Sequence, residues 1–132
     1  MLVGATVRDN EYGWKLESFS PALLVAERFG LACLGGQIQF QFEDAIFEVY
    51  WLSADSSKRV RGESWHEYVH RSCNEVANEF RDLTANLNVQ QVIQQWPGLQ
   101  ARMEAGSDPF KVMCFVAYFV TEAEYLSLRD AV

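Results

Sequence analysis

Two neighbouring segments with strand-like patterns constrain the fold of this chain more than any other feature. Residues 37–42 read Gln-Ile-Gln-Phe-Gln-Phe, and residues 46–52 are rich in β-branched and aromatic residues. Strict alternation of apolar and polar residues is typical of a strand with one buried face, and the short gap between the segments suits the tip of a hairpin. The sequence therefore predicts a β-hairpin over residues 37–52.

One register of this hairpin places its large apolar residues on a single face, because residues that lie opposite each other in a pair of strands share a face. In that register Glu43 lies opposite Ile46 across the tip. The predicted apolar pairs are Phe42 with Phe47, Phe40 with Val49, and Ile38 with Trp51. The other face then carries Gln37, Gln39, Gln41, Glu48 and Tyr50.

A long amphipathic helix is predicted after the hairpin and a polar loop over residues 53–63. Ser64 and Glu67 have the spacing of a capping box, in which each side chain bonds the backbone N–H of the other residue. Apolar residues recur at helical spacing from Trp65 to Phe80, so we expect a helix that packs one face on a sheet and ends near residue 83.

Shorter elements complete the prediction. Strands are expected over residues 12–16, with another before it at residues 2–7, and over residues 110–120; helices are expected over residues 21–29, 89–96 and after Thr121. This order predicts an α+β fold: a mostly antiparallel sheet of four to five strands, with one long amphipathic helix and shorter helices packed on it. We expect a single domain over residues 1–132.

Charge and composition exclude some classes of function. The net charge is −7, and residues 9–55 hold eight acidic but only two basic residues. Binding of duplex nucleic acid requires Lys and Arg to neutralise phosphates, so a basic protein partner is the better expectation. The most apolar run, residues 110–120, is well short of the ~20 residues that a membrane helix needs. Three separated cysteines in apolar surroundings indicate reduced thiols and a cytoplasmic protein.

Residues 66–70 read His-Glu-Tyr-Val-His, which resembles the motif of the zincin metalloproteases. The resemblance implies His66 and His70 as zinc ligands and Glu67 as the general base. However, capping by Ser64 would place the motif in the first helical turn, where the helix dipole opposes a cation. The chain has only two histidines, so a third ligand would have to be another residue type. We therefore expect no metal or other cofactor and keep a zinc-dependent hydrolase as the alternative.

The leading hypothesis is a small acidic cytosolic protein-binding module without enzymatic activity, such as an inhibitor or immunity-type protein that neutralises a basic partner. The candidate partner-binding residues are Gln39, Gln41, Glu43, Asp44, Glu48, Tyr50 and Asp55. A further alternative is a domain that binds a small apolar ligand in a cavity between hairpin and long helix. The predicted lining of that cavity is Phe40, Trp51, Trp65 and Phe80.

Overall fold

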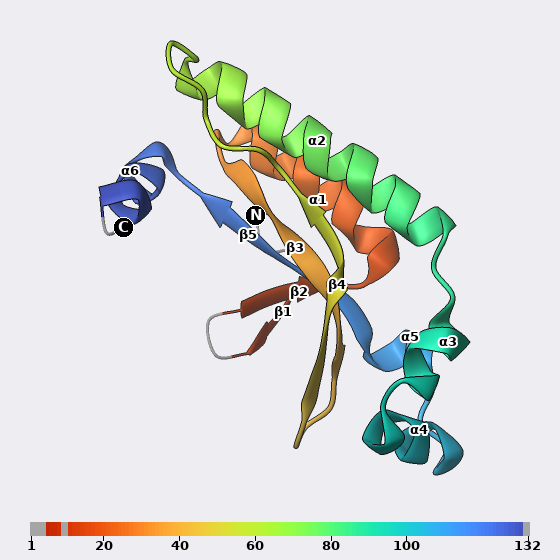
Figure 1. Ribbon diagram of the computed structural model, residues 1–132. Helices are drawn as coiled ribbons and strands as arrows, with labels where there is room; N and C mark the ends of the chain where they lie inside the picture. Colours follow the sequence, from red (N-terminus) through yellow and green to blue (C-terminus); the bar gives the residue numbers. More distant parts are fainter. Residues whose placement is uncertain (1–4, 9–10, 131–132) are drawn as a thin grey trace.

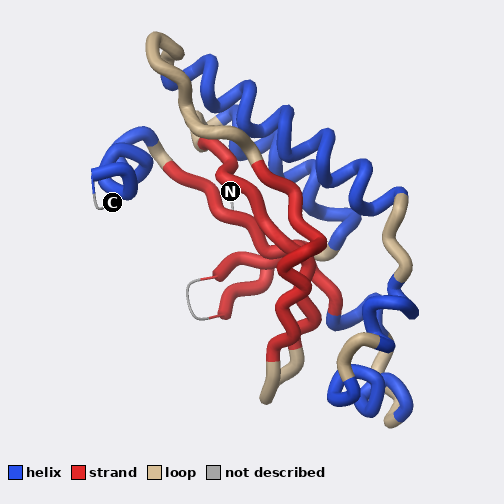
Figure 2. Tube along the Cα trace, viewed as in Figure 1, coloured by secondary structure: helices blue, strands red, loops and turns tan. Residues whose placement is uncertain are grey.

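A five-stranded antiparallel sheet forms the centre of the computed structural model, which describes residues 5–8 and 11–130 (Figures 1 and 2). The strands are β1 (Ala5–Arg8), β2 (Glu11–Trp14), β3 (Ala32–Gln41), β4 (Ile46–Asp55) and β5 (Met113–Val120). Their order across the sheet is β1-β2-β5-β3-β4, and every neighbouring pair is antiparallel. The predicted α+β class and antiparallel sheet are confirmed; the part of the predicted first strand before residue 5 lies outside the described residues.

Two helices, α1 (Leu16–Arg28) and α2 (Trp65–Ala85), lie side by side and cover one face of the sheet (Figure 1). Three short helices gather beyond the C-terminal end of α2: α3 (Val89–Gln94), α4 (Pro97–Glu104) and α5 (Pro109–Val112). The last helix, α6 (Glu122–Asp130), lies at the opposite end of the molecule. Within the described part of the chain, no helix is both long and apolar enough to cross a membrane.

Aromatic rings fill the space between the two long helices and the sheet. Phe19 of α1 is fully buried, with its ring centroid 4.8 Å from that of Phe80 in α2 and 4.5 Å from that of Phe115 in β5. Trp14 at the end of β2 packs on the same ring at 5.8 Å. Such packing of large rings gives the chain its core without disulfides, since the three cysteines are free and buried.

The start of α2 confirms the predicted capping box. The Glu67 N–H donates to Ser64 Oγ at 3.1 Å, and the Ser64 N–H donates to Glu67 Oε1 at 3.0 Å. Two of the N–H groups that a helix start leaves without partners are thereby satisfied. The helix ends at Ala85, two residues beyond the predicted end.

Several predicted element boundaries were wrong. The strand predicted over residues 12–16 ends at Trp14, the hairpin strands extend to Ala32 and Asp55, and the helix predicted over residues 89–96 ends at Gln94.

α1 begins at Leu16, five residues before the predicted start at Pro21, because burial of Phe19 in the core holds the first turn against the sheet. The predicted strand over residues 110–120 begins only at Met113. Asp108 accepts a hydrogen bond from the Phe110 N–H and caps the short helix α5 ahead of the strand.

The register of the β3–β4 hairpin also differs from the prediction. Phe40 pairs with Phe47 and Ile38 pairs with Val49, two residues away from the predicted partners. The predicted apolar face is kept, because a shift of two residues preserves the alternation. The tip lies one residue earlier than expected: Phe42 donates its N–H to the Ala45 carbonyl oxygen at 2.8 Å, which leaves Glu43 and Asp44 at the tip.

A bulge in β4 interrupts this hairpin. Ile38 pairs with Val49, but the preceding residue Gln37 pairs with Ser53, so residues 50–52 of β4 have no counterpart on β3. We call residues 50–52 the β4 bulge. Its Trp51 is 41% exposed, and the buried Ala54 takes the next core position instead. The prediction that Trp51 lies in the core was therefore wrong.

Candidate functional site

The residues of the predicted zinc motif take part in helix capping and in a surface contact with α1. Glu67 is held by the Ser64 N–H, which lowers the pKa of its carboxyl group and makes it a weaker base. His66 is exposed, and the His70 Nδ1 contacts the Glu27 carboxylate of α1. Among the residues that the structure describes, no three His, Cys, Asp or Glu side chains form a group that could hold a metal ion. This geometry gives no support to the alternative of a zinc-dependent hydrolase.

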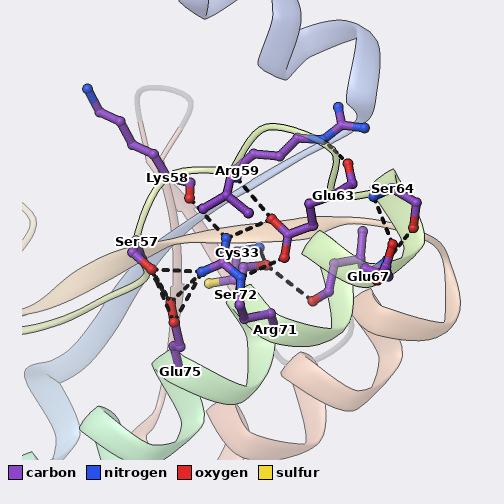
Figure 3. Close-up of polar contacts among 12 residues, drawn as sticks. Cys33, Ser57, Lys58, Arg59, Glu63, Ser64, Glu67, Arg71, Ser72 and Glu75 are labelled. Carbon is purple, nitrogen blue, oxygen red and sulfur yellow. Dashed lines mark hydrogen bonds and ion pairs between the residues drawn. The ribbon is translucent and has the colours of Figure 1, made fainter.

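Arg71 organises a polar network that ties the loop over residues 56–63 to α2 (Figure 3). Its guanidinium binds Glu63 through two N–H···O bonds of 2.7 and 2.8 Å and Glu75 at 3.1 Å. It also donates to the Lys58 carbonyl oxygen at 2.9 Å and to Ser57 Oγ at 2.7 Å. The hydrogen bonds from Arg71 lower the pKa of Glu63 to about 2. The sequence predicts a solvated polar loop, whereas these contacts of Arg71 hold the loop in one conformation.

A second set of contacts holds the other side of the loop. Arg59 forms an ion pair with Glu122 of α6 at 2.8 Å, and its guanidinium lies 5.3 Å from the centre of the Trp65 ring. The Arg59 N–H donates to the hydroxyl of Tyr125 in α6 at 3.1 Å. These contacts join the loop, the start of α2 and α6 into one structure.

A pocket of about 640 Å³ lies between this loop, α2 and α6. Leu34, Tyr68, Tyr125 and Leu128 supply most of its apolar surface, and Lys58 lies at its side. Tyr68 is almost fully buried, and burial raises its pKa to about 12, so its phenol is neutral. Sequence analysis missed this pocket because its walls come from segments that are far apart in the chain.

The polar face of the hairpin is less exposed than predicted. Gln39 is fully buried, so its expected role as an exposed partner-binding residue was wrong. The reason is that β3 lies inside the sheet, where Gln39 has Glu48 of β4 on one side and Cys114 of β5 on the other. Gln41 is partly buried and donates to Gln39 Oε1 at 3.1 Å. These two amides therefore contact each other within the sheet.

The predicted acidic residues fall into two groups. Glu43, Glu48 and Asp55 are exposed. Asp44 is instead bound by both terminal nitrogens of Arg102 in α4, at 2.8 and 2.9 Å. Asp44 is thereby neutralised within the protein, although its side chain is exposed. Glu48 and Asp55 form no ion pair among the described residues.

The β4 bulge displays an aromatic surface. Tyr50 is 70% exposed, and its ring centroid lies 5.1 Å from that of Trp51 in an edge-to-face contact. Trp51 in turn packs on Trp96 at 5.4 Å, and Trp96 packs on Phe47 at 5.8 Å. We call Tyr50, Trp51 and Trp96 the bulge surface. Trp96 was not predicted as part of any site, because its contact with the hairpin depends on how α3 and α4 fold back onto β4.

The predicted apolar cavity does not form. Phe40 and Phe80 are buried in the main core, whereas Trp65 belongs to a separate cluster with Tyr68. Trp51 lies at the surface. The four residues therefore do not line one space.

The molecule described so far is a small α+β domain with an acidic, aromatic surface on one edge of its sheet. Comparisons with models of protein families, with characterised proteins and with solved structures found no match for the chain. Its own residues and geometry are therefore the basis for the function proposed below.

Proposed function

We propose that this chain is a protein-binding module that docks onto a basic partner through the bulge surface and the acidic residues beside it. It would act as a small inhibitor or immunity-type protein. The observation that carries this proposal is the exposure of Tyr50 and Trp51 at an irregularity in an edge strand. Exposed aromatic residues are enriched at protein interfaces because they bury a large area and lose little side-chain entropy.

Charge supports the choice of a basic partner. Residues 37–55 contain four acidic residues and no Lys or Arg. Glu48 lies two residues before Tyr50, and Asp55 ends the same strand, so exposed carboxylates flank the aromatic rings along β4. The nearby Arg102 is already paired with Asp44. A basic surface would thus meet uncompensated negative charge around an aromatic centre, which speeds association and selects against acidic partners.

The test is to purify the tagged protein from its native cells, identify a co-purifying partner and measure the affinity of the purified pair. We expect the dissociation constant to rise when salt is increased from about 50 to about 300 mM, because surface charges are screened. Tyr50→Ala and Trp51→Ala should each weaken binding by about 30-fold, as is typical of aromatic interface residues. Glu48→Lys should also weaken partner binding, and its effect should be larger at low salt than at high salt because surface charges are less screened there.

Matched control substitutions lie on the helical face of the molecule. Leu24→Ala removes an exposed apolar side chain from α1, and Glu79→Lys reverses an exposed acid on α2. Both variants should bind the partner as the unmodified protein does. If binding does not depend on salt, or if the bulge variants bind as tightly as these controls, the proposal is wrong.

The pocket between the loop and α6 supports a second candidate function, the binding of a small, largely apolar ligand. Its volume of about 640 Å³ and its lining by Tyr68, Tyr125 and Leu128 favour such a ligand. A suitable probe is the fluorescent dye 1-anilinonaphthalene-8-sulfonate. The function requires saturable fluorescence that is lost in a Leu128→Asp variant; unchanged fluorescence in that variant would exclude this pocket.

A further inference from the structure

A small cleft lies on the sheet between the bulge surface and β5, with a volume of about 330 Å³. Gly35 and Gly36 of β3 form its floor, and Tyr50 and Tyr118 contribute aromatic rings. Tyr50 is 70% exposed and Tyr118 is 48% exposed, so both rings are accessible from outside. Atoms of β4 and β5 fill the positions that side chains of Gly35 and Gly36 would take, so the room for a ligand group is the space between the two rings.

The cleft contains one carboxylate, and its position is defined by the pairing of three strands. Gly35 pairs with Asp55 of β4 on one side and with Tyr118 of β5 on the other. A Cβ atom added to Gly35 would lie 2.6 Å from Asp55 Oδ1, so the carboxylate lies over the glycine. Gly35 also has a φ of 126°, which a residue with a side chain rarely adopts. The absence of a side chain at Gly35 therefore makes room for the Asp55 carboxylate.

The chemistry of the lining selects the kind of group that can enter. Asp55 is the only charged residue among those that line the cleft; the remaining polar groups are Gln37, Ser53 and the two phenols. Aromatic faces attract cations, and a carboxylate binds a guanidinium through two parallel hydrogen bonds. A planar guanidinium can lie against a tyrosine ring and bind Asp55 at the same time, which a lysine ammonium does less well.

We propose that this cleft binds an arginine side chain of the basic partner, with the guanidinium between Tyr50 and Tyr118 and paired with Asp55. The inference rests on the proposed function and names the residue type that the module recognises. The volume is near the lower limit for small-molecule pockets, which suits one side chain better than a larger ligand. Tyr50 belongs to both the cleft and the bulge surface, so the inserted arginine would lie at the centre of the interface.

The cleft can be tested without the partner. N-acetyl-arginine amide is titrated into the isotopically labelled protein, and the backbone amide signals of Gly35 and Gly36 are followed by NMR. We expect saturable shifts at these two glycines, with a dissociation constant on the order of millimolar for so small a probe. N-acetyl-lysine amide should bind more weakly, and the neutral citrulline analogue should cause no saturable shift.

Substitutions distinguish specific binding of the arginine probe in the cleft from its general electrostatic attraction to an acidic protein. Asp55→Asn should weaken binding of the arginine probe at least about tenfold, and Tyr118→Leu about threefold. Glu79→Gln removes the same charge from the outer face of α2 and should leave binding unchanged. Comparison of the NMR spectra of the variants before titration shows that each is folded.

The inference is overturned if citrulline or lysine amide binds as well as arginine amide, if the shifts occur away from Gly35 and Gly36, or if Asp55→Asn binds like Glu79→Gln. Its failure can be told apart from failure of the proposed function. If partner binding depends on Trp51 and Glu48 but not on Asp55, the proposed protein-binding function stands and the arginine-binding cleft is refuted. If the arginine probe binds but no partner with salt-dependent affinity is found, the arginine-binding cleft stands and the proposed protein-binding function is refuted.

Discussion

At the scale of single residues, one arginine and two glycines have the clearest structural roles. Arg71 collects two carboxylates, a hydroxyl and a backbone carbonyl, and thereby holds a loop of polar residues in a fixed position (Figure 3). Gly35 and Gly36 allow three strands to approach closely. Each of these roles leads to a measurable effect of substitution.

The ion pair between Arg71 and Glu63 should make stability depend on pH in acid. The pKa of Glu63 is about 2 in the folded protein and 4.5 for an ordinary glutamate. A lowered pKa stabilises the fold fully above pH 4.5, and this stabilisation is lost as the pH falls toward 2. We expect Glu63→Gln to melt a few degrees below the unmodified protein at neutral pH, with the difference shrinking across that window.

The control for this measurement is Glu79→Gln. Glu79 is exposed on α2 and forms no ion pair within the described part of the chain. Its variant should melt like the unmodified protein at every pH. A constant difference between Glu63→Gln and the unmodified protein down to the lowest pH would show that the ion pair does not carry the effect.

A methyl group at Gly36 should be far more costly than one at Gly98. At Gly36 the added Cβ would lie 2.1 Å from the Val116 carbonyl oxygen, so the backbone of two central strands would have to separate. We expect Gly36→Ala to cost about 3 kcal/mol or more in the free energy of unfolding. At Gly98 the nearest atoms are 3.6 Å away, on the Phe47 ring, and Gly98→Ala in helix α4 should be neutral or stabilise by up to about 1 kcal/mol.

Chemical denaturation of both variants measures these free energies. Equal effects of the two substitutions would mean that β3 and β5 do not approach as closely at Gly36 as described.

At the scale of elements, a local signal in the sequence predicted where α2 starts, whereas the start of α1 and the pairing of the strands depended on long-range contacts. The Ser64–Glu67 capping box was predicted because both partners are three residues apart and need nothing else from the fold. The hairpin was predicted from its alternation, yet its register was not, because a slip of two residues keeps the same face buried. The β4 bulge had no local signal: it depends on Ala54 entering the core in place of Trp51.

Substitutions at Phe40 and Trp51 can distinguish the observed register of the β3–β4 hairpin from the expected one. Phe40 is buried in the core, whereas Trp51 lies at the surface against Trp96. We expect Phe40→Ala to destabilise the protein by about 3 to 5 kcal/mol and Trp51→Ala by less than about 1.5 kcal/mol. Denaturant titration of the two variants gives both values. Similar, large losses for both would indicate that Trp51 packs in the core after all.

At the scale of the whole molecule, the position of β5 dominates the architecture. The last strand in the sequence lies in the middle of the sheet, between β2 and β3. Its apolar run predicted burial on both faces, and residues 113–117 are all buried. Its place in the strand order could not be predicted from the sequence, because hydrophobic pattern does not specify which neighbours a buried strand has. The same holds for the candidate site, whose cleft and bulge surface combine residues from several strands and helices.

Two truncations should therefore have opposite outcomes. A chain that ends at residue 112 lacks β5, so β1 and β2 lose their connection to β3 and β4, and we expect no cooperative unfolding transition. A chain that ends at Thr121 lacks α6 and keeps all the other described elements. It should stay folded while losing the packing of Tyr125 on Trp65 and Tyr68.

Thermal unfolding followed by circular dichroism distinguishes the two truncated chains. A cooperative transition in the shorter one would show that the remaining strands form a stable sheet without β5.

The late position of β5 also determines when the protein can fold during its synthesis. Until the ribosome has added residues 113–120, the inner edges of β2 and β3 have no strand between them, and the rings of Phe19 and Phe80 lack the Phe115 ring that covers them. Edges of this kind readily pair with other chains. The nascent polypeptide is therefore vulnerable to aggregation until residues 113–120 have been added, and the insertion of this single strand completes the sheet.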